Sequence, residues 1–91
     1  MTTPRPTVAD LETALRAALS PTALEVVDDS HLHAGHAGAR EGSHFTVRLR
    51  SARFEGLSRV ARHRLVYDAL GPWMKHGIHA LALDARAPSD P

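Results

Sequence analysis

The chain has 91 residues, of which 43% are hydrophobic and 23% charged, and it contains no cysteine. This composition is typical of one small globular domain and excludes a disordered chain. Without cysteine the chain can form no disulfide, and it has no thiolates with which to hold zinc or an iron–sulfur cluster. No apolar run reaches the roughly 18 residues that a membrane-spanning helix needs, and residues 1–6 lack the apolar stretch of a signal peptide. We therefore expect a cytoplasmic protein with no membrane partner.

The net charge is only +1, but the cations are unevenly distributed along the chain. Residues 48–64 form a basic block that contains six arginines and a single acid, Glu55. The arginines are Arg48, Arg50, Arg53, Arg59, Arg62 and Arg64. Such a block can attract phosphate groups or an acidic partner, and it can equally be a solvated face of the domain. The sequence leaves both interpretations open.

The first predicted element is a helix over residues 8–19, preceded by a disordered tail at residues 1–6. Thr7 and Asp10 have the spacing of a capping box. The apolar residues that recur at helical spacing are Leu11, Ala14, Leu15, Ala18 and Leu19. The Ser20-Pro21 pair ends the helix.

Three segments are predicted to be strands. Residues 24–28 form a short candidate. Residues 45–50 alternate, so that Phe45, Val47 and Leu49 face a core while Thr46, Arg48 and Arg50 face water. Residues 78–85 are almost all apolar, which predicts a buried strand. Residues 29–43 are too long and too rich in glycine and histidine for a tight hairpin, and the tail at 87–91 is predicted to be frayed.

Between the second and third strands the sequence predicts a pair of helices. Ser58 can cap a short helical turn, and a second helix runs from about Arg62 with Leu65 and Val66 on its core side. Gly71-Pro72 should break or kink that helix. The predicted fold is therefore a single α+β domain over residues 7–86. Its three-stranded mixed sheet is covered on one face by helices, and its second and third strands are parallel.

Histidines are the candidate ligands. His31, His33 and His36 lie in the predicted loop, and His79 opens the last strand. Neutral imidazole is a common metal ligand, so loop and strand could share one ion, although a polar loop and a hydrogen-bonded strand histidine would explain the same residues. His44 is interpreted as a residue that orders the strand entrance. No glycine-rich phosphate loop, nucleophile elbow or pair of carboxylates is present, so we do not expect an enzyme.

Four short segments in order resemble the signature of the BolA family. They are residues 43–45 (SHF), 51–58 (SARFEGLS), 62–67 (RHRLVY) and 78–81 (IHAL), and the resemblance covers about 75 residues. It implies a fold similar to the class II KH domain, with the order α-β-β-α-α-β and a helix pair arranged like a helix-turn-helix. The chain departs from the family at Gly71-Pro72, which interrupts the second long helix, and it lacks the C-terminal helix that many relatives carry.

The resemblance also implies a function. BolA-like proteins are adaptors that partner a monothiol glutaredoxin in iron homeostasis, and they donate histidine ligands to a shared [2Fe-2S] cluster whose other ligands come from a glutaredoxin cysteine and glutathione. The ligands implied here are His79 and His33, with His31 and His36 as alternatives to His33. The isolated chain is expected to bind no cluster and to be a monomer or a weak homodimer.

The resemblance allows an alternative function, a DNA-binding transcriptional regulator. The helix pair and the basic residues would then contact phosphates, with Arg48, Arg50, Arg53, Arg62 and Arg64 as the candidate residues. The helices lack the Gly-x-x-Gly loop with which KH domains bind single strands, which argues against that particular mode of binding.

Overall fold

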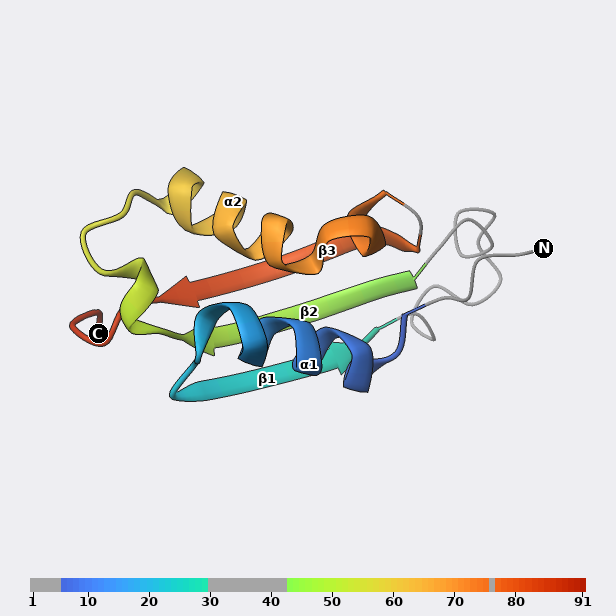
Figure 1. Cartoon of the computed structure of the whole chain (residues 1–91), viewed down its shortest axis with the longest axis horizontal. Helices are drawn as coiled ribbons and strands as arrows, with labels where there is room; N and C mark the ends of the chain where they lie inside the picture. Colours follow the sequence, from blue (N-terminus) through green and yellow to red (C-terminus); the bar gives the residue numbers. More distant parts are fainter. Residues whose placement is uncertain (1–5, 30–42, 76) are drawn as a thin grey trace.

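The computed structural model describes residues 6–29, 43–75 and 77–91. These residues form two α-helices and one three-stranded sheet (Figure 1). The helices are α1 (Val8–Leu19) and α2 (Arg59–Leu70), and the strands are β1 (Ala23–Asp28), β2 (Ser43–Arg50) and β3 (Ile78–Arg86). Two short 3₁₀ turns, η3 (Ala52–Phe54) and η4 (Gly71–Met74), flank α2 in the chain. Over the described ranges, neither helix is long and apolar enough to cross a membrane.

Helix α1 begins and ends where the sequence predicts. The Thr7 hydroxyl accepts a hydrogen bond from the Asp10 amide, and the Asp10 carboxylate accepts one from the Thr7 amide, which completes the capping box. Ser20 adopts a left-handed conformation with φ 45° and ends the helix. The buried leucines of α1 all lie on the face toward the sheet and are Leu11, Leu15 and Leu19.

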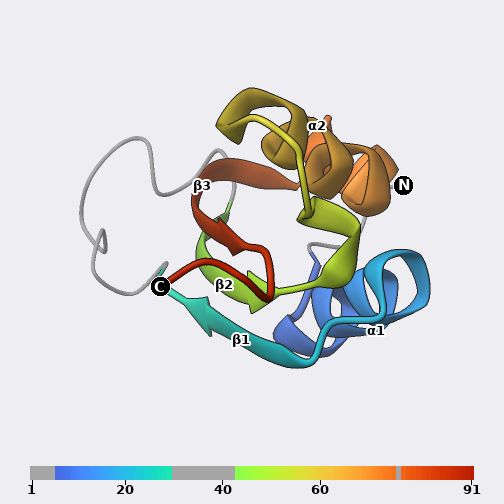
Figure 2. The same ribbon diagram turned by 90° about the vertical axis from the view of Figure 1, so that its left-hand side faces the viewer.

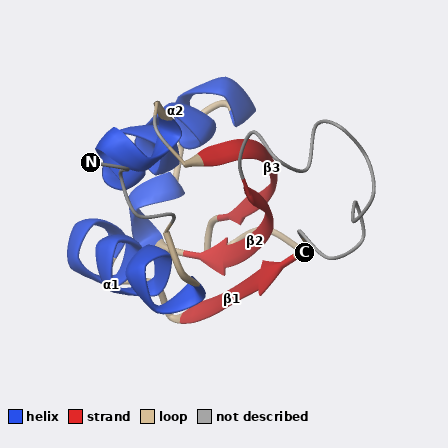
Figure 3. Ribbon diagram, turned by 90° about the vertical axis from the view of Figure 1, so that its right-hand side faces the viewer, coloured by secondary structure: helices blue, strands red, loops and turns tan. Residues whose placement is uncertain are grey.

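The sheet has the order β1-β2-β3, with β2 antiparallel to β1 and parallel to β3. Both helices cover the same face of this sheet, as Figures 2 and 3 show. Phe45, Val47 and Leu49 of β2 are buried between sheet and helices, together with Phe54, Val66 and Leu70. The α+β prediction with a mixed sheet and parallel second and third strands is confirmed.

Two expectations about the segments around α2 need correction. Strand β3 is an edge strand and is less buried than its composition predicts, because His79, Ala80 and Ala82 are exposed. Ile78 is buried, and Leu81 and Leu83 pack partly against the core. The short turn expected after Ser58 and the helix expected from about Arg62 are one continuous helix, because α2 begins at Arg59, directly after the Ser58 cap. The 3₁₀ turn η3 precedes this helix in the chain. The break at Gly71-Pro72 is observed, since α2 ends at Leu70 and continues as η4.

The end of the chain folds back on the domain. Although its composition predicts fraying, Ala87 is fully buried, and the Arg50 Nη1 donates to the carbonyls of Ala87 at 2.7 Å and Asp90 at 2.8 Å. Arg62 forms an ion pair with the Asp90 carboxylate. We call this arrangement of Arg50, Arg62 and residues 87–91 the tail clasp.

Gly77 permits a close approach between two distant segments. Its φ is 154°, and a Cβ at this position would lie 2.6 Å from Cδ of Pro6, which is buried. We expect Gly77→Ala to lower the free energy of unfolding by about 1–3 kcal/mol, because it adds both backbone strain and a clash with a proline ring. Gly56→Ala is the control, since Gly56 also has a positive φ of 75° but faces open space. Urea unfolding of both variants measures the difference, and equal losses would contradict the packing of Pro6 on Gly77.

The tail clasp predicts a pH dependence of stability. The hydrogen bond from Arg62 and the amide of Ala87 hold the pKa of Asp90 below its usual value. A carboxylate with a lowered pKa in the folded state contributes stability above its unfolded pKa of about 3.9, and this contribution is lost as the pH falls through the lower folded pKa. Asp90→Asn should therefore destabilise the domain at neutral pH and reduce the loss of stability on acidification. Glu12→Gln, which removes only an exposed helical pair with Arg16, should leave that loss nearly unchanged in urea titrations.

Candidate metal-ligand site

Two histidines meet at the end of the sheet where β2 and β3 begin. Because the strands are parallel, their first residues lie at the same end, and Ser43 is paired with Ile78. The register then shifts by one residue, so that His44 is paired with Ala80 and His79 is the additional residue of the irregularity. The imidazoles of His44 and His79 lie side by side at this irregularity, with ring centroids 5.1 Å apart and ring planes inclined at 47°.

The two rings differ in their access to solvent. His79 is exposed, whereas the Nε2 atom of His44 is buried. His79 can therefore approach a group on another molecule, and His44 packs beside it and limits the orientations of its ring. Ala80 and Ala82, which follow His79 on the edge strand, are exposed and small, so they leave room for a partner surface to approach.

The separation of the rings fits a shared metal. Two imidazoles that bind one tetrahedral ion through nitrogen at about 2.0–2.1 Å have ring centroids about 5 Å apart. Among the described residues no group of three or more potential ligands occurs, so further ligands for an ion here must come from outside these residues. Two imidazoles on one iron of a [2Fe-2S] cluster is a known ligand set, with thiolates on the other iron.

The ligand residues predicted from the sequence are only partly described. His79 lies at the sheet end as expected, whereas His31, His33 and His36 lie outside the described residues. The contact between His44 and His79 was missed. Each histidine is the second residue of its strand, so the predicted parallel pairing of the two strands already contained this signal.

Three of the five arginines predicted to contact nucleic acid are engaged within the domain. Arg48 forms an ion pair with Glu25, with 2.8 Å between Nη1 and Oε1, and Arg50 and Arg62 hold the tail clasp. Arg53 and Arg64 are exposed, and their guanidinium groups make no hydrogen bond or ion pair with the residues that the structure describes. Only these two remain open to an external phosphate among the five.

Comparisons with known proteins agree with the fold and with the sequence signature. The family model of the BolA-like protein matches residues 15–90. The chain is 45% identical over 84 residues to human BolA-like protein 1, covering 92% of this chain and 60% of the human protein. It is 47% identical over 73 residues to the DNA-binding transcriptional regulator BolA of Escherichia coli K12, covering 80% of this chain and 68% of that protein. The solved structure of BolA1 from Arabidopsis thaliana is similar with a TM-score of 0.80 and 37% identity, over 98% of this chain and all (100%) of that one.

The fold and the sequence matches together define a small α+β protein of a non-enzymatic class. The chain belongs to the BolA family.

Proposed function

We propose that this protein is an adaptor that shares a [2Fe-2S] cluster with a monothiol glutaredoxin and takes part in iron homeostasis. The observation that carries the proposal is an exposed imidazole, His79, beside a second one at the end of the sheet where β2 and β3 begin. The chain has no cysteine, so the thiolate ligands have to come from a partner. A glutaredoxin cysteine and glutathione together provide two such thiolates.

The residues of the chain have separate tasks in this proposal. His79 donates a neutral imidazole to the metal from the irregular start of β3, where its side chain is exposed. His44 packs against that imidazole and keeps it at the sheet end. The second ligand from this chain is a histidine of the loop, for which the family resemblance favours His33 over His31 and His36, or it is His44 after rotation of its ring.

We expect His79→Ala to abolish or strongly change the visible spectrum of the cluster complex. The complex is formed by anaerobic reconstitution with a monothiol glutaredoxin and glutathione, and its mass is measured alongside the spectrum. The free energy of unfolding should change by less than about 0.5 kcal/mol, because the side chain is exposed.

His63→Ala is the matched control for this substitution. His63 lies on α2, away from the sheet end, and its removal should leave the spectrum unchanged. A spectrum of the His79→Ala complex identical to that of the unchanged protein would refute the assignment of His79. His44→Ala separates the two assignments of the second ligand, because a change in spectrum comparable to that of His79→Ala would favour His44 over a loop histidine.

A second function, regulation of transcription by DNA binding, is favoured by the name of the Escherichia coli relative. On this chain it would use the exposed Arg53 and Arg64. The affinity for duplex DNA should then be near the 10⁻⁴ to 10⁻⁶ M that is typical of non-specific binding, since the net charge is only +1.

Changing both Arg53 and Arg64 to Gln should weaken this binding. The slope of log affinity against log salt should decrease by about two units, one for each lost phosphate contact. Arg48→Gln, which removes an arginine already paired with Glu25, should change the slope much less. Fluorescence titrations of a labelled duplex at several salt concentrations measure these slopes, and an unchanged slope in the double variant would exclude this surface.

A further inference from the structure

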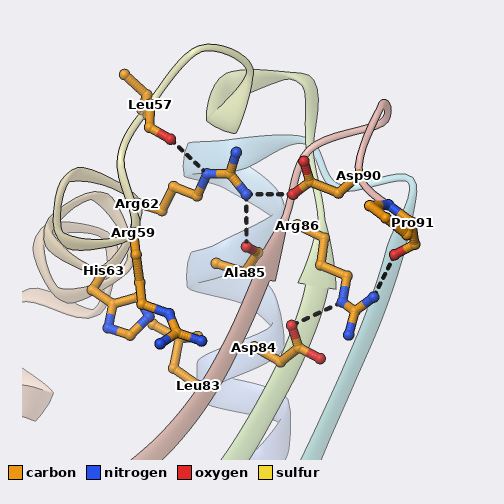
Figure 4. A pocket seen from close by; sticks show the side chains of 10 residues that line it. All are labelled: Leu57, Arg59, Arg62, His63, Leu83, Asp84, Ala85, Arg86, Asp90 and Pro91. Atoms are coloured by element: carbon orange, nitrogen blue, oxygen red, sulfur yellow. Dashed lines mark hydrogen bonds and ion pairs between the residues drawn. The ribbon is translucent and has the colours of Figure 1, made fainter.

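A second candidate site lies between α2 and the far end of β3. The cavity there has a volume of about 450 Å³ (Figure 4). Its walls come from four segments: Leu57 before α2, Arg59, Arg62 and His63 from α2, Leu83 and Arg86 from β3, and Asp90 from the tail. It shares none of these residues with the histidine pair at the start of β3.

Arginines and acidic groups line the cavity together. Each of its aspartates is already paired with an arginine, Asp90 with Arg62 and Asp84 with Arg86, the latter with 3.0 Å between Nε and Oδ1, and Arg86 also donates to the Pro91 oxygen. Arg59 has no hydrogen-bond or ion-pair partner within the described ranges of the chain. The positive charge of Arg59 is therefore uncompensated at this wall of the cavity.

His63 provides a second donor at the same wall. It lies one helical turn after Arg59, so their Cβ atoms are about 5–6 Å apart on one face of α2. Its ring meets Tyr67 edge-on with 6.3 Å between ring centroids, a contact that restricts its orientation. Figure 4 shows both side chains, Arg59 and His63, at the same edge of the cavity.

The position of these groups in α2 adds to the positive potential. The first turn of a helix carries a partial positive charge and usually contains acidic residues, yet the first turn of α2 contains none and includes Arg59 and Arg62. In the described part of the chain, the acid that reaches this end of α2 is Asp90, which binds Arg62. A cation-rich helix start beside a cavity favours an anion from outside the chain.

We propose that this cavity binds the phosphate group of a phosphomonoester, with Arg59 and His63 as its principal donors. A phosphomonoester carries nearly two negative charges and three acceptor oxygens, enough to use both donors at once. A carboxylate ligand would carry one negative charge, the same charge that Asp90 already places beside Arg62. Leu57 and Leu83 provide apolar surface in the same cavity for the carbon part of the ligand. This site does not depend on the proposed cluster function.

The test is a titration of the isotope-labelled chain with inorganic phosphate and with phenyl phosphate, followed by NMR at constant ionic strength. Saturable shifts are expected at residues 59–63 and 83–86 in the millimolar range, with phenyl phosphate binding more tightly than inorganic phosphate. Arg59→Gln should weaken binding about five- to tenfold, the loss of one charge-assisted contact. Arg16→Gln is the matched control, because it removes an exposed arginine of α1 that does not line the cavity, and its effect should be below about twofold.

A second arm of the experiment distinguishes the source of the phosphate. An oligonucleotide with a 5′-phosphate should bind more tightly than the same oligonucleotide without it if the cavity accepts a terminal monoester. Equal binding of the two would identify the internal phosphodiesters as the ligand and overturn the proposal. The proposal is also refuted if Arg16→Gln weakens binding as much as Arg59→Gln, or if the shifts fail to saturate.

Discussion

The parallel pairing of β2 with β3 is the constraint on which the rest of this structure depends. Parallel neighbours cannot be joined by a hairpin, so the chain must cross over the sheet between them, and α2 with its two flanking 3₁₀ turns provides that connection. The crossover places Val66 and Leu70 over the core formed by β2 and α1. It also brings together residues far apart in sequence, such as His44 and His79, which no local preference could place side by side.

The same pairing determines what the arginines do. Arg50 is the last residue of β2 and is paired with Arg86, the last residue of β3. The chain that continues from β3 therefore begins beside Arg50, whose guanidinium donates to its carbonyls. A basic block that looks like one surface in the sequence is thus divided into internal donors and exposed cations. Buried carbonyls need donors, and arginine, with five N–H groups, can satisfy several of them at once.

Local signals in the sequence were sufficient for most of the fold. Thr7, Ser20 and Gly71 mark helix ends through backbone chemistry that acts within a few residues, and the alternation in β2 identifies its buried face. Contacts between residues far apart in the sequence could not be predicted from such local signals. The tail clasp depends on donors from β2 and α2, and the extra residue at His79 depends on a register shift against a distant strand. The exposed face of β3 was misjudged because alanine is compatible with both a buried and an open position.

The two candidate sites lie at opposite ends of one strand. His79 is the second residue of β3, and the cavity is lined by residues 83–86 of that strand, so at about 3.3 Å per residue the histidine and the cavity are about 13–23 Å apart along it. A phosphate at Arg59 therefore cannot touch a metal at His79, and either ligand can affect the other only through the packing of α2 and β3. If phosphate binding changed the affinity of the chain for its cluster partner, the partner would have to change the affinity for phosphate by the same factor. Two observations separate true coupling between the sites from a direct effect of phosphate on the partner. Only true coupling is reciprocal at the cavity of this chain. A direct effect, in contrast, would persist in the Arg59→Gln variant.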